Sequence, residues 1–536
     1  MTLALKAIPL PLLLYVLGTV ASSTPETFHE ELTLRPLRDG KVISRFSFST
    51  LLGGAIPRNP DVLDAGNTPQ HYSLFPLGLG QVLREYAATE LHLSLNSGKW
   101  EYDRWGYPDE QEVGTGAQLW AWIGDGGQAT VDERWKGLRN ALAGLFCASI
   151  GSLDDQRTTS PTLAFAPEGD LPAWPLPHHL RHATLPSENV CTENLTPFLK
   201  LLPCKGLSGL ASLLNPHRLF DADWHGMSVH VSWRARRGVE VRLAFQAVFD
   251  PVRMSTDRKR DWSLQSIFDR TIPKACPIAE SSRIAVELPK NEAYAVDPRP
   301  TSVQDGVAVY DTSQVNDLDV SLRWPLESVF SYPLDHPAEP LSQVSVQRTL
   351  KGTSQSRGQL SVSIANSLPS EIQAIYLETM PWHVQFYLHT LKIVVDGQAR
   401  DDLLSDIAYT PPEPHGRPAL LESVLTLPPN STTHLDMEVM KSFLRYTEHP
   451  PDAQRGWDLP PAVLVNFTPG GRRQRLYTRT LLVDLATPDF SMPYNVIIMS
   501  CTLIALTFGM VFNLMTRKFV VVRLKKGEKA SKEKAD

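Results

Sequence analysis

The sequence predicts a mainly β protein, with β-sandwich-like domains and a few helices, followed by one C-terminal transmembrane helix. Short segments of alternating polar and apolar residues recur between turn signals, which is the pattern of half-buried strands. Helical periodicity is confined to two segments in the first third of the chain. Residues 496–515 contain no charged residue and are long enough to cross a membrane as a helix.

The two ends of the chain predict its membrane topology. Residues 1–21 have a charged start at Lys6 and an apolar stretch that leads to small residues, which is typical of a cleaved signal peptide. Residues 516–536 form a tail with eight Lys or Arg against three Asp or Glu. Because basic flanks stay on the cytosolic side, we expect a type I single-pass protein with most of its mass in the lumen.

The tail ends in a pattern that is typical of a retrieval signal. Lys532 and Lys534 occupy the fifth and third positions from the C-terminus, which is the spacing of a dilysine signal for the endoplasmic reticulum. We therefore expect a protein of that membrane. The alternative interpretation is a solvated run of charge without a receptor.

Composition limits the remaining possibilities. The formal charge is −6 although the tail is basic, and no basic stripe of the kind that binds nucleic acid is visible in the rest of the chain. The hydrophobic content of 42% indicates a folded chain. A proline-rich stretch at 325–340 divides it into an N-terminal β-rich region with helices, 22–335, and a second β-sandwich-like region, 336–490.

The strand predictions begin with a hairpin over residues 31–48. Its two alternating segments flank Asp39-Gly40, a favoured turn pair. The other predicted strands are 227–233, 239–249, 359–364, 384–395 and 420–427.

Two segments are predicted to be helical, 79–91 and 131–147. In the second, one helical face collects the apolar side chains Trp135, Leu138, Leu142, Leu145 and Phe146. Residues 161–177 contain five prolines and are predicted to be a loop.

Four of the five cysteines, Cys147, Cys191, Cys204 and Cys276, fall in the predicted lumenal part, where disulfides form. They allow two internal bridges, or one bridge and thiols available to a partner. Cys501 falls inside the predicted span.

Three N-x-S/T sequons lie in the same part of the chain, at Asn194, Asn430 and Asn466. An exported chain is exposed to the glycosylation machinery, so we expect N-linked glycans.

The usual catalytic motifs are missing from the sequence. His178, His179 and His182 resemble a metal site, but the prolines before them argue against a helix and no Cys or carboxylate joins them at a suitable spacing. We interpret them as part of a surface loop. We therefore expect no metal, no cofactor and no catalytic residue.

The span has one face of small residues. Cys501, Ala505 and Gly509 recur every four residues, so another helix can approach closely on that face. Asn495 and Asn513 add polar groups that favour contact with protein or with a lipid head group. The alternative is a lipid-facing helix with incidental small residues.

Several motifs of the sequence resemble those of the PIG-T family, the large lumenal subunits of the glycosylphosphatidylinositol (GPI) transamidase. The most specific is TPDFSMPYNVI at 487–497, which runs directly into the span. Similar motifs cover most of the chain, at 118–122, 145–149, 190–197, 202–204, 261–264 and 380–382.

The resemblance implies a non-catalytic subunit that holds a caspase-like catalytic subunit, similar to PIG-K, while GPI anchors are attached to precursor proteins. The expected partners are that subunit, the PIG-S, PIG-U and Gaa-type subunits, the GPI lipid and the precursors. From the residues alone, a stand-alone lumenal hydrolase and an early-secretory cargo receptor or chaperone are the alternatives.

The resemblance also assigns the cysteines. Cys191 matches the family's intersubunit cysteine, so it is expected to form the interchain disulfide. We then expect Cys204 to pair with Cys276 and Cys147 to be a buried thiol on the apolar face of its helix. The alternative is a Cys191–Cys204 bridge across a short loop.

Overall fold

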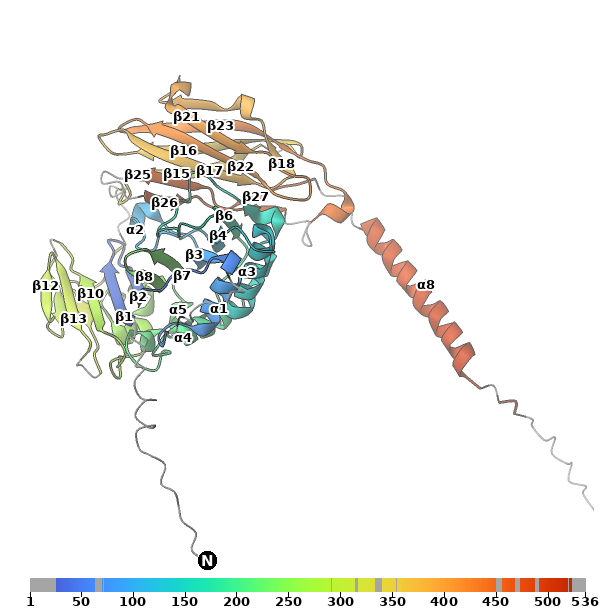
Figure 1. Cartoon of the computed structure of the whole chain (residues 1–536). Coiled ribbons are helices and arrows are strands. Elements are labelled where there is room, and N and C mark those ends of the chain that lie inside the picture. The colour runs from blue at the N-terminus through green and yellow to red at the C-terminus, as the bar shows by residue number, and fades with distance from the viewer. Residues whose placement is uncertain are drawn as a thin grey trace, which may run out of the picture. The chain divides into compact units, whose positions relative to one another are not determined.

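The computed structural model describes residues 26–522, apart from 63–69, 71, 291, 314–316, 333–339, 353, 450–455, 468–472, 487–490 and 519. The predicted signal peptide and the two tail lysines, Lys532 and Lys534, therefore lie outside the described residues. The described chain is mostly β, with several sheets and one long C-terminal helix (Figure 1), as predicted.

An eleven-stranded sheet dominates the first part of the chain. Its strand order is β12-β13-β10-β1-β2-β8-β7-β3-β4-β6-β5, and only the β1–β10 pair is parallel. The strands are β1 (Glu26–Pro36), β2 (Val42–Gly53), β3 (Ala88–Ser97), β4 (Gly116–Gly124), β5 (Thr158–Thr159), β6 (His178–Leu185), β7 (Trp224–Arg234), β8 (Gly238–Phe249), β10 (Ser281–Glu287), β12 (Ser302–Gln304) and β13 (Val307–Asp311).

The predicted β1–β2 hairpin is confirmed, with antiparallel pairing along its whole length. Gly40 has a φ of +81° in the turn, and an added Cβ there would lie 2.6 Å from the ring of Phe330. The glycine is therefore required by both backbone conformation and space. The strands predicted at 227–233 and 239–249 are confirmed as the β7–β8 pair.

Helices pack on one face of this sheet. The helix predicted at 131–147 is confirmed as α3 (Val131–Phe146), which begins with a capping box between Thr130 and Glu133. Its buried residues, including Trp135 and Leu138, join one hydrophobic cluster with Leu91 of β3. The loop predicted at 161–177 contains no helix or strand.

The helix predicted at 79–91 was partly wrong. Helix α1 covers Leu77–Glu85, and the chain turns at Ala87, whose φ is +51°, before continuing as β3. Nine of the ten residues of β3 are buried, because both faces of the strand are covered. Leu91, Leu93 and Leu95 face the helices, and the alternate positions face the second part of the chain.

The second part of the chain contains two facing antiparallel sheets (Figure 1). Side chains from both, including Leu435 and Tyr376, line one small internal cavity, so the sheets form a sandwich. One sheet contains β15 (Val344–Lys351), β16 (Arg357–Asn366), β18 (Val384–Phe386), β19 (Lys392–Val395), β20 (Gln398–Ala399) and β23 (Ser431–Lys441). The other contains β17 (Ile372–Met380), β21 (Leu404–Thr410), β22 (Ala419–Leu427), β25 (Val463–Phe467) and β26 (Arg473–Tyr477).

The strands predicted at 359–364 and 420–427 are confirmed as β16 and β22, whereas the segment 384–395 is not one strand. A 3-10 turn at Leu388–Thr390 interrupts it, and β18 and β19 pair separately with β23. The apolar pattern of this segment is therefore shared by two short strands.

The described residues of 26–443 and 456–485 form one compact unit. One hydrophobic cluster joins the two parts of the chain within this unit. It includes Trp120 and Phe165 from the first part and Val465 and Tyr477 from the second. Within the described chain, each sheet takes its strands either from residues before 333 or from residues after 339. The division into domains at 22–335 and 336–490 stays a prediction.

The other unit contains Leu444–His449 and the described residues from Ala486 onward. Its main element is α8 (Ser491–Thr516), of which Tyr494–Thr516 is apolar and long enough to cross a membrane. Among the described residues this is the single helix that meets both conditions.

Candidate partner-binding surface and buried charged cluster

The exposed Cys191 lies at the start of helix α4 (Thr192–Leu201), as its N-cap residue. The Asn194 carboxamide accepts a hydrogen bond from the Cys191 backbone N–H at 2.8 Å. Its nitrogen donates to the carbonyls of Phe146 and Cys147, at 3.0 and 3.1 Å. One buried amide therefore fastens the start of α4 to the end of α3 and holds Cys191 at a defined place on the surface.

Cys147 is exposed, so the prediction of a buried thiol was wrong. Helix α3 ends at Phe146, and Cys147 is its C-cap in the left-handed conformation, with φ +53°. This conformation turns the chain away from the apolar face, which ends with Phe146. Among the described residues before α8, Cys147 and Cys191 are the two exposed thiols.

The surroundings of the Cys191 thiol do not favour the thiolate, which is the nucleophilic form. Burial and the neighbouring Glu193 carboxylate raise its pKa above the ordinary value. A catalytic thiolate requires the opposite shift. The Cys191 thiol donates a hydrogen bond to the Asn194 side-chain oxygen, at 3.2 Å.

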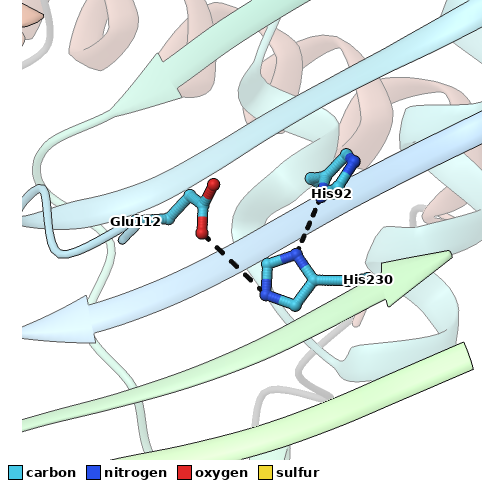
Figure 2. A group of neighbouring side chains, drawn as sticks. All are labelled: His92, Glu112 and His230. Carbon is cyan, nitrogen blue, oxygen red and sulfur yellow. Dashed lines mark hydrogen bonds and ion pairs between the residues drawn. The ribbon is translucent and has the colours of Figure 1, made fainter. Parts of the chain in front are cut away.

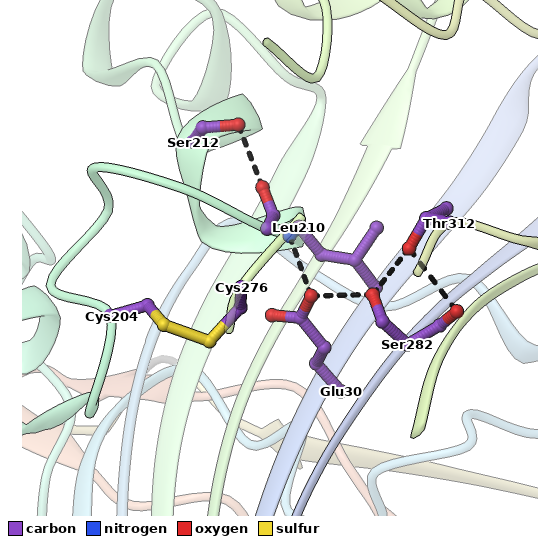
Figure 3. Close-up of a disulfide and its surroundings, with 8 residues drawn as sticks. Glu30, Cys204, Leu210, Ser212, Cys276, Ser282 and Thr312 are labelled. Atoms are coloured by element: carbon purple, nitrogen blue, oxygen red, sulfur yellow. Dashed lines mark hydrogen bonds between the residues drawn. A yellow bond between two sulfur atoms is a disulfide. The ribbon is translucent and has the colours of Figure 1, made fainter. Parts of the chain in front are cut away.

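Cys204 and Cys276 form the disulfide that we expected, with their Cα atoms 6.0 Å apart (Figure 3). The bridge joins the segment after α4 to the segment before β10. Beside it, the Glu30 carboxylate accepts hydrogen bonds from the Leu210 N–H and the Ser282 hydroxyl. The disulfide therefore ties the chain that follows α4 to the sheet, which limits movement of the helix that presents Cys191.

The three sequons lie in different environments. Asn430 is exposed in the turn between β22 and β23. Asn194 is fully buried and Asn466 is 3% exposed in strand β25. A glycan on Asn194 would replace one of the two N–H donors of its amide nitrogen and so break one of these hydrogen bonds, and the fully buried side chain leaves no room for a sugar. The structure therefore contradicts Asn194 and Asn466 as glycan acceptors, while Asn430 stays a prediction.

The small-residue face and both asparagines of the predicted span lie on α8. Gly509 is half-exposed, and the other four residues are exposed: Asn495, Cys501, Ala505 and Asn513. The proposed packing and lipid contacts of these five residues stay predictions.

The histidines at 178–182 belong to strand β6, so the surface-loop interpretation was wrong. Strand alternation separates them, because His178 and His182 lie on one face and His179 on the other. His182 is buried beside Gln118 and Thr159. Burial, assisted by the nearby Arg475 charge, lowers its pKa to about 3, so it is neutral at physiological pH.

A buried charged cluster, which we did not predict from the sequence, lies on the face of the first sheet opposite the helices. It is organised around a row of opposed residues on neighbouring strands, in the order Trp120, His92, His230, Arg242. The His92 and Trp120 rings stack at 3.8 Å. Adjacent to the row are the carboxylates of Glu90, Glu110, Glu112 and Glu168 and the guanidinium of Arg475.

The two histidines are hydrogen-bonded to each other, with their Nδ1 atoms 2.8 Å apart (Figure 2). On the outer sides, His92 Nε2 lies 3.1 Å from Glu90, and His230 Nε2 lies 3.5 Å from Glu110. Four carboxylates face three guanidiniums, those of Arg45, Arg242 and Arg475.

His92, Glu112 and His230 bring one ligand atom each within 4.8 Å of one another, so we asked whether they fit a metal ion. They do not fit well. The facing Nδ1 atoms are at hydrogen-bond distance and aim at each other instead of at a common point. Glu112 already accepts from Arg475 at 2.7 Å, and that guanidinium would repel a cation. The arrangement is an ion-pair network that joins strands.

Its sequence signal is weak but real. Glu90 and His92 are polar residues at alternate positions of β3, which places them on one face, whereas Glu110 and Glu112 lie in the loop before β4. A covered strand with charged residues on one face requires charged partners from elsewhere. The sequence does not show that Arg475 supplies one of them.

The fold and these surfaces define a class: a β-rich protein with one candidate membrane span, an anchored exposed thiol and an internal ion-pair network. The family model described as "Gpi16 subunit, GPI transamidase component" matches residues 12–260 and 250–536. The chain therefore belongs to the Gpi16 family of GPI transamidase components.

Individual relatives agree with this assignment. The chain is 36% identical to the human and the mouse "GPI-anchor transamidase component PIGT", with 96% and 97% of this chain and 95% of each relative covered. It is 30% identical to the "GPI transamidase component GPI16" of Saccharomyces cerevisiae, over 92% of this chain and 89% of the relative.

Proposed function

We propose that this chain is the non-catalytic subunit of a GPI transamidase that holds and stabilises the caspase-like catalytic subunit in the lumen of the endoplasmic reticulum. Family membership supports the complex. The observation that carries the holding role is Cys191, an exposed thiol that is fixed by buried Asn194 and has no disulfide partner within the described chain.

The partner bond is a disulfide between Cys191 and a cysteine of the catalytic subunit. A raised thiol pKa suits a structural bridge, which forms once under oxidising conditions and need not react again. A covalent link keeps the two chains at high effective concentration, so non-covalent contacts around it can be modest. The remaining subunits, PIG-S, PIG-U and Gaa-type, complete the complex, which acts on GPI lipid and precursor proteins.

Topology supports the same proposal. With α8 as a type I span, the compact β unit lies in the lumen, where precursors arrive, and the basic tail lies in the cytosol. The catalytic residues belong to the partner.

Non-reducing electrophoresis of the complex isolated from microsomes tests the proposal. Wild type is expected to run as a heterodimer that separates on reduction, and Cys191→Ser is expected to abolish that band. Cys147→Ser is the matched control, because Cys147 is the other exposed lumenal thiol and its carbonyl shares Asn194 with Cys191. A heterodimer that survives Cys191→Ser, or that is lost with Cys147→Ser, would overturn the assignment.

A further inference from the structure

A cavity of about 700 Å³ opens at the end of the β1–β2 hairpin, away from Cys191 in the sequence. Arg35 and Arg38 come from the hairpin, Trp105 and Tyr107 from helix α2 (Tyr102–Trp105) and the turn after it, and Lys290 from the segment after β10. The volume lies in the range of small-molecule sites and is much larger than a single inorganic ion requires.

The charge of the cavity is opposite to that of the protein. Its lining contains four cationic side chains against two carboxylates, in a chain with a formal charge of −6. The cations are Arg35, Arg38, Arg260 and Lys290, and the carboxylates are Glu287 and Glu292. A positive concavity in an acidic protein attracts anions selectively.

One of the cations is already neutralised. Arg260 pairs with Glu327 at 2.7 Å and with Glu292 at 3.1 Å, and its guanidinium lies over the Trp324 ring at 4.3 Å. Trp324 in turn donates its indole N–H to Glu292 at 2.8 Å. These contacts make Arg260, Trp324 and Glu292 one wall of the cavity. The Glu292 carboxylate is already paired within that wall.

The other cations are available. Arg38 and Lys290 are exposed, and neither forms a hydrogen bond or ion pair with the described part of the chain. Arg35 donates from Nη2 to the carbonyls of Trp105 and Tyr107, at 3.3 and 3.4 Å, which aims the guanidinium. Its Nε is buried and has no hydrogen-bond partner among the described residues.

The remaining carboxylate in the lining is that of the half-buried Glu287. Burial raises the pKa of Glu287, although the charges of Arg35 and Lys290 act in the other direction. Of the four cations in the lining, Arg260 alone has a carboxylate at ion-pair distance among the described residues. The cavity therefore has an excess of positive charge, and the N–H donors of Arg38 and Lys290 are free to bind a ligand.

We infer that this cavity binds a phosphate ester carried on a sugar or a similar polar ring. Guanidinium and ammonium groups together provide the charge-assisted hydrogen bonds that a phosphate needs. The exposed Arg38 and Lys290 are the groups that hold the phosphate, and the charge of the half-buried Arg35 adds to the attraction. The half-buried Pro36 and Leu288 and the wall at Trp324 leave room for the carrier. This inference does not rest on the proposed function.

Binding to the purified full-length protein in detergent tests the inference, with glucose 6-phosphate as the probe. Saturable binding is expected, and it is expected to weaken as salt is added. Arg38→Gln/Lys290→Gln is expected to weaken it at least about tenfold, which corresponds to about 1.4 kcal/mol. Lys136→Gln/Lys274→Gln is the control, because it removes two exposed cations outside the cavity and is expected to leave affinity unchanged.

Further probes decide what the cavity recognises. Glucose is expected not to bind, and inorganic phosphate is expected to bind more weakly than glucose 6-phosphate. Phosphatidylcholine vesicles with and without phosphatidylinositol separate a lipid-borne phosphate ester from a soluble one. The inference is overturned if no phosphate probe saturates, if the double variant binds as wild type does while its unfolding temperature is unchanged, or if inorganic phosphate binds as tightly as the sugar phosphate.

Discussion

The guanidinium of Arg475 forms a buried ion pair with Glu112, 363 residues earlier in the chain, at 2.7 Å. The same guanidinium lies 5.0 Å from the centre of the Trp120 ring. Strand β26 belongs to the sandwich in the second part of the chain. It thereby places a charge against the charged face of the eleven-stranded sheet. This contact, together with the shared hydrophobic cluster, explains why sheets from the two parts form one compact unit.

Arg475→Met should destabilise the protein by about 3–5 kcal/mol, because it leaves the buried Glu112 carboxylate without its partner. Unfolding of the full-length protein in detergent, followed by fluorescence, measures the change. Arg473→Met is the control, since Arg473 is exposed on the same strand and its loss should change stability by less than about 0.5 kcal/mol. Equal effects of the two variants would show that the ion pair does not join the parts.

His182 should make stability depend on pH below about 6.5. Burial lowers its folded pKa to about 3, against about 6.5 in the unfolded chain. Below pH 6.5 the unfolded chain binds a proton that the folded chain does not, so this contribution is complete above 6.5 and is lost as the pH falls toward 3. At pH 5 the loss is about 2 kcal/mol.

His182→Gln should therefore flatten the curve of unfolding temperature against pH between about 6.5 and 4.5. His179→Gln serves as the control, because that ring is half-exposed on the opposite face of strand β6 and its loss should keep the wild-type slope. Parallel curves for His182→Gln and wild type would contradict the assignment of the pH dependence to this residue.

Asn430 should be the glycan acceptor among the three sequons. Asn430→Gln should remove the mass that peptide N-glycosidase F releases, whereas Asn194→Gln and Asn466→Gln should leave it unchanged, because both side chains are buried. Gel mobility before and after the glycosidase is the measurement. Glycan loss in Asn194→Gln would mean that this sequon is modified before α4 packs.

Bulk on the small-residue face of α8 should weaken assembly. Ala505→Leu/Gly509→Leu forces a neighbouring helix away, so recovery of other subunits in a gentle detergent pull-down should fall severalfold. Thr507→Leu/Leu514→Phe adds bulk to the opposite face and should have little effect. The face contacts lipid instead of protein if both variants recover the complex equally.

Lys532→Ser/Lys534→Ser should let the isolated chain reach the Golgi if these lysines form a retrieval signal. Maturation of its glycans to resistance against endoglycosidase H is the measurement. Partners should be depleted, because a complex can retain its members independently. Continued sensitivity of the double variant to the enzyme would show that another element retains the chain.

The sequence by itself determined the features that depend on neighbouring residues. The Asp39-Gly40 hairpin, helix α3 and the apolar span all follow from turn chemistry, periodicity and length, which act within a few residues. The resemblance added the family and the cysteine assignments, and the Cys204–Cys276 pairing agreed with the structure. These features required no knowledge of distant contacts.

Tertiary structure alone decided what depends on packing against distant parts of the chain. β3 is a strand because both of its faces are covered, and Asn194 is buried because its amide links two helices. Cys147 is exposed because α3 ends one residue earlier. Arg475 meets Glu112 and Glu168 across more than 300 residues, and periodicity, which records only which face a residue occupies, cannot indicate what covers that face.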